Sequence, residues 1–253
     1  MVYEMSSGLF DEETIQALKQ LFSSFKKELN DYLVVDDLER LSKREASTHH
    51  HHIHPHHEGC PTCGEAKLLA EELSKISEGK LRFKIIDLKS NETAILKPRY
   101  TPAFIYDIPK KNIRYYGLPS GQEFAPFIYI HQYIANNIVK LPREVIDLAK
   151  SIETPLHIKI FVTPECPYCP IVVDAINQMG LVNDLLLVET IEAIELPLEA
   201  DMYGVSYVPD IIITDPEKQT EYGVEPIERI NGYMPPEELA KIIKNASEKL
   251  SKR

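Results

Sequence analysis

The chain has 253 residues, of which 43% are hydrophobic, enough for two domains of ordinary size with apolar cores. Its formal net charge of −11 argues against nucleic acid as a partner, because phosphate binding requires clustered lysine and arginine. Because the sequence has neither a signal-peptide pattern nor an apolar run of membrane-spanning length, we expect a soluble cytoplasmic protein without a membrane partner.

The first half of the chain contains a recognisable series of elements after a pair of cysteines, Cys60 and Cys63. A helix is expected over GEAKLLAEELSKISEG (64–79) and a strand over LRFKIIDL (81–88). A second strand follows in RYTPAFIYDI (99–108), which contains a proline. A short strand, a glycine and a helix over QEFAPFIYIHQYIANNI complete the series.

The second half repeats this series, and a helix at 141–155 leads into it. Cys166 and Cys169 precede a helix in IVVDAINQMG, a strand in LLLVETIEAI and a proline-containing strand in SYVPDIIIT. The first cysteine and the proline are 42 positions apart in the first half and 43 in the second. Such an internal repeat predicts two domains of one architecture, residues 1–140 and 141–253.

The four cysteines form two CxxC pairs and leave none for a conventional disulfide framework, which indicates redox or metal chemistry. A strand–helix–strand unit needs a right-handed crossover, which places each pair at the turn from strand to helix. There the helix N-terminus stabilises the thiolate of the first cysteine. We expect Pro61 and Pro167 to begin the two helices. The expected nucleophiles are Cys60 and Cys166, and the expected resolving thiols are Cys63 and Cys169.

This arrangement resembles the thioredoxin fold, an α/β fold with a central mixed sheet flanked by helices. The tandem copy resembles the two-domain protein disulfide oxidoreductases, glutaredoxin-like proteins of thermophilic archaea and bacteria. Its most specific segments are FVTPECPYCP, EAIELPLEADMYGVSYVP and RYYGLPSGQEF. The resemblance implies an enzyme that reduces, oxidises or isomerises protein disulfides through redox-active cysteine pairs, without a bound cofactor. It also implies a thioredoxin-reductase-like flavoenzyme as the electron donor.

The repeated prolines match that family's cis-proline, which faces the cysteine pair. The resemblance implies that Pro102 and Pro209 are cis and that the backbones of Thr101 and Val208 pair with an extended substrate. Tyr168, between the cysteines of the second pair, is a candidate for substrate contact through its flat ring. The sequence CPYC resembles the glutaredoxin site, whose potential lies roughly between −200 and −230 mV.

A histidine-rich segment, residues 49–57, stands where the repeat requires the strand that leads into the first cysteine pair. The second copy has the apolar run LHIKIFV (156–162) at this position, whereas the first has HHHIHPH (50–56). Three interpretations remain open. The histidines form the strand, or residues 43–58 form a loop while DYLVV (31–35) supplies the strand, or the segment derives from a purification tag.

Histidine nitrogens and cysteine thiolates together are suitable ligands for tetrahedral zinc, and such tracts also bind zinc adventitiously. The candidate ligands are His54, His56, His57, Cys60 and Cys63. A metal-binding or metal-delivery protein is therefore one alternative function. A dedicated electron donor to a peroxidase is another.

Few other residues suggest a role in the chemistry. His131 and His157 stand among apolar residues and are expected to be packing residues. The strand at 156–162 contains no acid that could accept a proton from a resolving cysteine. Glu192 and Glu195 on the following strand are candidates for buried acids, with no placement that the sequence defines.

Overall fold

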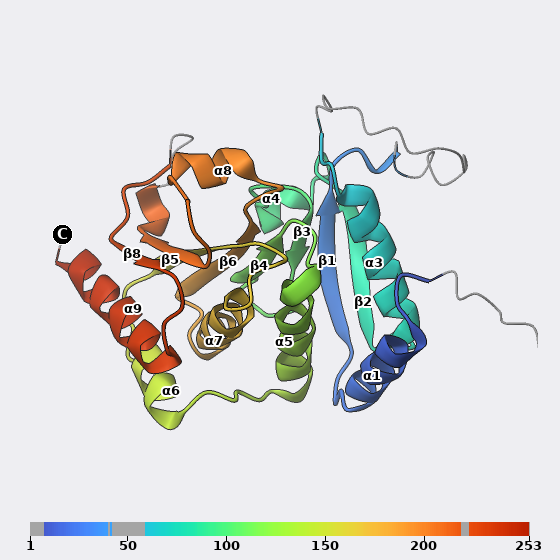
Figure 1. The fold of residues 1–253 in the computed structure, drawn as a ribbon, viewed down its shortest axis with the longest axis horizontal. Helices are drawn as coiled ribbons and strands as arrows, with labels where there is room; N and C mark the ends of the chain where they lie inside the picture. The colour runs from blue at the N-terminus through green and yellow to red at the C-terminus, as the bar shows by residue number, and fades with distance from the viewer. Residues whose placement is uncertain (1–7, 40, 42–58, 219–222, 253) are drawn as a thin grey trace, which may run out of the picture. The chain divides into compact units, whose positions relative to one another are not determined.

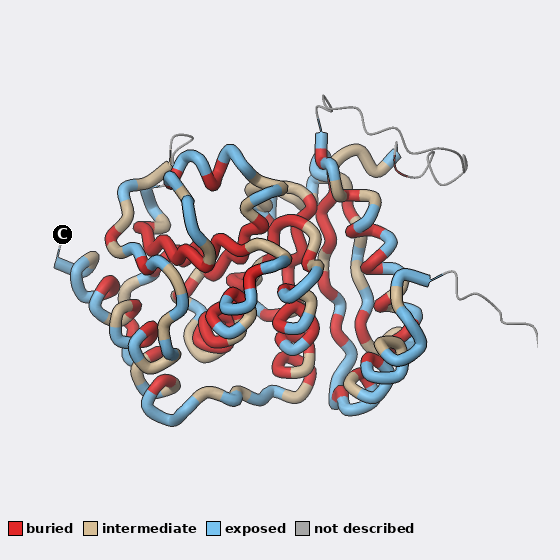
Figure 2. Tube along the Cα trace, in the orientation of Figure 1, coloured by how far each residue is buried: buried red, intermediate tan, exposed pale blue. Residues whose placement is uncertain are grey.

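The computed structural model describes residues 8–39, 41, 59–218 and 223–252. The chain divides into two compact units, Met1–Asp107 and Ile108–Arg253. Each unit has a β-sheet covered by helices (Figure 1). Figure 2 shows that the buried residues concentrate in the strands and in the helix faces that pack on them. No helix within the described ranges is long and apolar enough to cross a membrane.

The first unit is built on a central strand with one parallel and one antiparallel neighbour. Its elements are α1 (Glu12–Ser23), β1 (Leu29–Val35), α3 (Cys63–Ile76), β2 (Leu81–Asp87), α4 (Thr93–Leu96) and β3 (Ala103–Ile105). Leu33 of β1 pairs with Ile85 of the parallel strand β2 and with Phe104 of the antiparallel strand β3. The apolar face of α3 packs on β1 and β2, and the helix thereby fixes the position of the first cysteine pair.

The second unit has a sheet with the strand order β4-β6-β5-β7-β8. Strands β4, β6 and β5 are parallel to one another, while β7 runs antiparallel to β5 and to β8. Its strands are β4 (Ile113–Tyr116), β5 (Leu156–Val162), β6 (Leu186–Glu192), β7 (Asp210–Thr214) and β8 (Glu228–Asn231). Its helices are η1 (Gly121–Glu123), α5 (Phe124–Asn136), α6 (Arg143–Lys150), α7 (Cys169–Val182), α8 (Pro197–Met202), η2 (Pro216–Lys218) and α9 (Pro236–Ser251).

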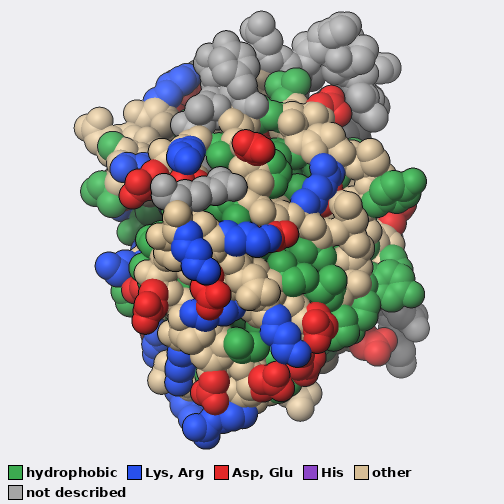
Figure 3. Space-filling view, turned by 90° about the vertical axis from the view of Figure 1, so that its left-hand side faces the viewer, with side chains coloured by type: hydrophobic (Ala, Val, Ile, Leu, Met, Phe, Trp, Pro, Cys, Tyr) green, Lys and Arg blue, Asp and Glu red, His purple; other side chains and the backbone are tan. Residues whose placement is uncertain are grey.

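Strand β5 is the centre of the second unit, and all seven of its residues are buried. Both faces of the sheet are covered, with α8 on one side and α6, α7 and α9 on the other (Figure 1). A parallel strand buried on both faces reads as an apolar run, which explains the sequence LHIKIFV. Outside this core, the surface over α9 carries basic and acidic side chains close together (Figure 3), including the pair Lys241 and Glu238.

The order of elements repeats along the chain, as the sequence predicts. Setting aside the two short 3₁₀ helices η1 and η2, the described elements follow one series twice: helix, strand, helix, strand, helix, two strands, helix. The second series begins with α6, close to the expected boundary at Lys140. The compact units divide earlier, after Asp107, because β4 pairs with β6 and α5 packs against α7. The boundary at 140 therefore follows the repeat, and as a domain boundary it stays a prediction.

The strand between β2 and β3 is β1, so the central position of the first copy is supplied by the segment that contains residues 31–35. Of the interpretations left open by the sequence, the one in which residues 31–35 supply this strand is therefore confirmed, and residues 50–56 lie outside the described residues. The whole histidine-rich segment, including His54, His56 and His57, lies outside the described residues. Within the described part of the chain, no group of three or more His, Cys, Asp or Glu could hold a metal ion.

Candidate active site

The second cysteine pair lies in the turn that joins β5 to α7. Cys166 and Cys169 form a disulfide with their Cα atoms 5.5 Å apart, a usual separation for this bond. Helix α7 begins only at Cys169, with Tyr168 as its N-cap residue. The expectation that Pro167 begins the helix is therefore wrong by two residues. The N–H of Cys166 donates to the carbonyl of Thr163 (3.2 Å), so this stretch is a turn rather than helix.

The two sulfur atoms of this pair differ in surroundings. Cys169 is fully buried, whereas 7% of Cys166 remains exposed at the surface. The backbone N–H of Cys169, the first residue of α7, points at Sγ of Cys166 at 3.1 Å. An N–H at a helix N-terminus has no partner inside the helix and favours an anionic acceptor. The geometry thus favours negative charge on the sulfur of Cys166, the one that a substrate can reach.

The prolines directly before β3 and β7 both follow cis peptide bonds, Thr101–Pro102 and Val208–Pro209. In the second unit, the carbonyl oxygen of Val208 lies 3.6 Å from Sγ of Cys166. The residue expected to pair with substrate is therefore adjacent to the expected nucleophile.

The first cysteine pair has a similar local arrangement within its own unit. Cys60 and Cys63 form a disulfide with a Cα separation of 5.5 Å, and Cys63 is fully buried while Cys60 is 9% exposed. Helix α3 begins at Cys63 with Thr62 as N-cap, so Pro61 also precedes its helix. The N–H of Asp36, one residue after β1, donates to Sγ of Cys63 at 3.4 Å.

The surface around the second pair is aromatic and apolar. Tyr168 is 57% exposed, and its ring centroid lies 5.8 Å from that of Tyr233. Tyr207, two residues before the cis-proline, is 77% exposed, and Ile171 in the first turn of α7 is 46% exposed. At the positions of Tyr168 and Ile171, the first copy has the polar residues Thr62 and Glu65. The two sites therefore present different surfaces to a partner.

An acid that the sequence analysis missed, Glu123, lies in a short segment that packs against α7, the helix of the second pair. Its side chain is buried, and its two carboxylate oxygens have no hydrogen-bond partner within the described chain. The 3₁₀ helix η1 that contains it contacts α7, and the N–H of Gln122 donates to the carbonyl of Pro164 (2.8 Å), two residues before Cys166. Burial raises the pKa of Glu123 to about 8. The only signal in the sequence is an acid at the start of a strongly apolar helix.

The acids named from the sequence have structural partners. Both were candidates for buried acids: Glu192 is buried, and burial raises its pKa, whereas Glu195 is half-buried and lies beyond the end of β6. Its carboxylate accepts the N–H groups of Ile194 (3.2 Å) and Glu195 (2.7 Å). Glu195 accepts the N–H of Leu118 at 2.9 Å. Both carboxylates thus accept hydrogen bonds from backbone N–H groups in nearby turns.

The two isolated histidines are buried, as expected for packing residues. The ring of His131 packs edge-to-face on Phe127 at 5.1 Å. Nε2 of His157 lies 2.7 Å from a carboxylate oxygen of Glu189. That carboxylate belongs to a buried polar cluster on the α8 side of the sheet, which no pattern in the sequence predicts.

Comparisons with known proteins agree with this geometry. Residues 156–226 match the family described as "Thioredoxin domain". A protein disulfide oxidoreductase from Aeropyrum pernix has a similar structure, with a TM-score of 0.74 at 20% identity and 97% of each chain covered. The F subunit of alkyl hydroperoxide reductase from Enterococcus faecalis gives a TM-score of 0.71 at 16% identity, over 92% of this chain and 98% of that one.

In sequence, the chain is 33% identical over 85 residues to the F subunit of alkyl hydroperoxide reductase from Staphylococcus epidermidis. This stretch is 33% of the present chain and 17% of the relative, so the likeness concerns a small part of that protein. The two structural likenesses, both below 25% identity, concern the fold. Together, the repeated elements, the paired cysteines and these comparisons show that the chain has the thioredoxin fold, with a thioredoxin domain at residues 156–226.

Proposed function

We propose that the protein is a protein disulfide oxidoreductase whose principal active site is the pair Cys166 and Cys169. The observation that carries the proposal is the position of one sulfur atom. Cys166 keeps 7% of its surface exposed while Cys169 is fully buried, and Sγ of Cys166 accepts the N–H of Cys169 and lies 3.6 Å from the carbonyl oxygen of Val208. A sulfur in these surroundings is suited to attack a disulfide that is presented by an extended peptide segment.

Reduction of a substrate follows two exchanges. The thiolate of Cys166 attacks one sulfur of the substrate disulfide, forms a mixed disulfide and releases the other substrate sulfur as a thiolate, which takes a proton from water. The thiol of Cys169 then loses its proton and attacks Sγ of Cys166. The substrate leaves as a dithiol, the enzyme pair becomes the Cys166–Cys169 disulfide, and two electrons have moved. Oxidation of a substrate is the reverse sequence.

Glu123 is the group that we assign to the proton of Cys169. The residue lies in the segment packed on α7, and its carboxylate has no partner among the described residues that would hold it in one protonation state. A carboxyl group with a pKa of about 8 is well matched to proton exchange with a thiol near neutral pH. In the resolving step its carboxylate form accepts the thiol proton, and in the reverse step its protonated form returns it.

The partners are assigned from the site and from the relatives. The Tyr168 and Tyr207 rings and the backbone of Val208 would bind extended, partly apolar protein segments that contain a disulfide. Thr101 beside Pro102 would have the same pairing role at the first site. We further propose a thioredoxin-reductase-like flavoenzyme as electron donor and the cytoplasm as the compartment, in line with the resemblance to two-domain oxidoreductases.

A second candidate function is electron donation to a peroxidase. The observation that favours it is the likeness to the F subunit of alkyl hydroperoxide reductase, both in sequence and in structure. The same cysteine chemistry would serve it, with one dedicated partner in place of many substrates. The metal-binding alternative depends on histidines that lie outside the described residues, and no observation within the described ranges supports it.

Partner trapping tests both candidates. Replacing Cys169→Ser removes the resolving thiol, so mixed disulfides at Cys166 should accumulate in cells and survive on a non-reducing gel. Mass spectrometry should place the bond at Cys166, and the matched variant Cys166→Ser should trap nothing at the second site. Many partners indicate a general oxidoreductase, whereas one peroxidase indicates the dedicated donor. If Cys169→Ser traps no protein under oxidising growth conditions, the proposal of a protein substrate is wrong.

A further inference from the structure

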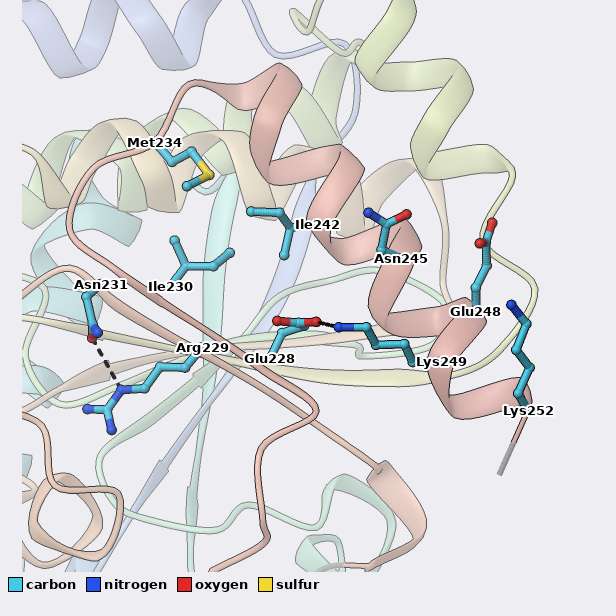
Figure 4. A pocket seen from close by; sticks show the side chains of 10 residues that line it. All are labelled: Glu228, Arg229, Ile230, Asn231, Met234, Ile242, Asn245, Glu248, Lys249 and Lys252. Carbon is cyan, nitrogen blue, oxygen red and sulfur yellow. Dashed lines mark hydrogen bonds and ion pairs between the residues drawn. The ribbon is translucent and has the colours of Figure 1, made fainter.

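The guanidinium group of Arg229 joins three parts of the second unit on the α8 side of the sheet. Its Nε and Nη2 donate to the two carboxylate oxygens of Asp210, at 3.1 and 2.5 Å. Nη1 donates to the carbonyl of Tyr203 (2.9 Å), and Nη2 also donates to the carbonyl of Gly204 (3.0 Å). Figure 4 shows the Arg229 side chain extending away from α9, with a further hydrogen bond from Nε to Asn231 (3.3 Å).

These contacts join the two ends of the loop between Gly204 and Asp210, which contains the backbone expected to pair with substrate. Tyr203 and Gly204 directly follow α8, and Asp210 directly follows the cis-proline Pro209. Between these anchors runs the segment 205–209, which includes Tyr207 and Val208. A forked arginine that holds a carboxylate at one end and two carbonyls at the other fixes both ends of this segment at once.

The tip of this loop is largely exposed, and hydrogen bonds hold the backbone on either side of it: the N–H of Val205 donates to the carbonyl of Ala200 (2.9 Å), and the N–H of Gly232 donates to the carbonyl of Pro209 (2.7 Å). Tyr207 is 77% exposed and Ser206 is also exposed, so the segment has few buried contacts of its own. The anchor below it is firm, because Asp210 is buried and the ring of Tyr203 packs against Phe161 at 6.0 Å. Arg229 adds to the backbone contacts of this loop a side-chain link between its two ends.

The first copy has no corresponding contact between an arginine and a carboxylate after its cis-proline. The residue after its cis-proline is Ala103, which has no carboxylate to receive a guanidinium. Arg114 occupies the position of Arg229, three residues before the glycine that ends the strand pair. Its Nη1 lies 3.4 Å from the hydroxyl of Tyr116 and 3.9 Å from Glu189, all in the second unit. Within the described residues, an arginine bound to the carboxylate that follows the cis-proline is therefore found at the second site and not at the first.

We propose that Arg229 is a positioning residue, which holds residues 205–208 in the conformation that pairs with an extended protein substrate. The inference rests on the proposed function and assigns a substrate preference to it. Because the loop is already ordered, a protein segment binds without first ordering it, and apparent affinity rises with the fraction of molecules in the competent conformation. A small disulfide, which needs only Sγ of Cys166, gains nothing from the loop. Arg229 therefore selects protein disulfides over small ones.

The test uses the full chain with Cys60→Ser and Cys63→Ser, so that only the second site reacts. Arg229→Gln and Arg229→Lys are compared with the parent for reduction of insulin, reduction of hydroxyethyl disulfide, and the midpoint potential in glutathione buffers. Arg143→Gln, which alters an exposed arginine on α6, is the control. For Arg229→Gln we expect KM for insulin to rise about tenfold, while kcat, the small-disulfide rate and the equilibrium constant with glutathione each change by less than about twofold. Arg229→Lys should lie between, because an ammonium keeps the charge but not the fork.

An unchanged KM for insulin in Arg229→Gln, or an equal loss with both substrates, would overturn the positioning role. If Arg229→Gln does not fold, Arg229→Lys carries the test, since it keeps a positive charge beside the buried Asp210, and its KM must then exceed that of the parent by about threefold. A parent chain that reduces neither insulin nor hydroxyethyl disulfide would instead refute the proposed function. The two failures are therefore distinguishable.

Discussion

At the residue scale, the proposed chemistry needs a group that takes the proton of Cys169, and we assign this role to Glu123, whose segment packs on α7. Burial alone raises its pKa from 4.5 to about 8, because no described group donates a hydrogen bond to the carboxylate. Strand β5 contains no acidic residue, so the sequence alone does not identify an acceptor for the proton of Cys169. The acceptor that we propose comes instead from a short segment outside that strand, and the packing of η1 on α7 suggests it.

Glu123 also makes stability depend on pH in a defined direction. Between pH 4.5 and about 8 the folded state holds a proton that the unfolded state has lost, so stability falls as the pH rises through this window. The shift corresponds to roughly 5 kcal/mol at most. We expect Glu123→Gln to lose this dependence, so that it gains stability relative to the wild type from pH 5 to pH 8. Urea unfolding of both proteins at several pH values measures the difference, and parallel curves would contradict it.

The same substitution should alter the chemistry. In the wild type the resolving step depends on the carboxylate form of Glu123, so the rate of mixed-disulfide resolution should rise with pH through the ionisation of Glu123 near pH 8. In Glu123→Gln this ionisation should disappear from the profile, and the rate near pH 7 should fall about tenfold or more. Stopped-flow release of a labelled peptide measures this step. A profile identical to the wild type would exclude Glu123 as the acceptor.

At the element scale, the turn that precedes α7 is held from outside by η1. Gly121 has φ +56°, and a Cβ at this position would lie 2.4 Å from the carbonyl oxygen of Pro164. The backbone of η1 therefore approaches the cysteine-bearing turn as closely as only glycine permits. The hydrophobic periodicity predicts the buried helix face but not this contact, which joins residues 43 positions apart in the chain. For the same reason it does not show that α7 begins at Cys169 rather than at Pro167.

Two glycines with nearly equal backbone angles separate steric from conformational effects. Gly204 has φ +59°, but a Cβ there would meet no atom of the described chain within 4 Å. Gly204→Ala should therefore cost only the left-handed conformation, about 1 kcal/mol. Gly121→Ala should cost about 2–4 kcal/mol, because the clash adds to the same conformational term, and it should also slow insulin reduction. Chemical denaturation of the pair is the measurement. Equal losses would mean that η1 does not press on the turn.

At the scale of the whole molecule, the repeat is visible in the sequence because each copy needs the same parts. Each has a buried central strand and a helix that begins at the cysteine pair. In the second copy the apolar run of β5 ends four residues before Cys166, so its assignment is direct. In the first copy, many residues separate the end of β1 at Val35 from Cys60 along the chain, and β1 contains the buried Asp31, which accepts the N–H of Asp107 at 2.9 Å. Hydrophobic periodicity reveals neither the long stretch of chain between β1 and Cys60 nor a polar residue in the core. Counting back from Cys60 by the distance that separates β5 from Cys166 therefore reaches the histidine-rich segment and not β1.

The two copies also diverge in the surfaces that a partner would meet. The second site has Tyr168 and a loop closed by Arg229, whereas the first has Thr62 and no carboxylate after its cis-proline. The central claim is accordingly that protein disulfides exchange at Cys166. Insulin reduction with dithiothreitol, compared for wild type, Cys166→Ser and Cys60→Ser, tests it most directly. We expect Cys166→Ser to lose most of the catalysed rate and Cys60→Ser a smaller share. A Cys166→Ser chain that reduces insulin at the wild-type rate would contradict the account.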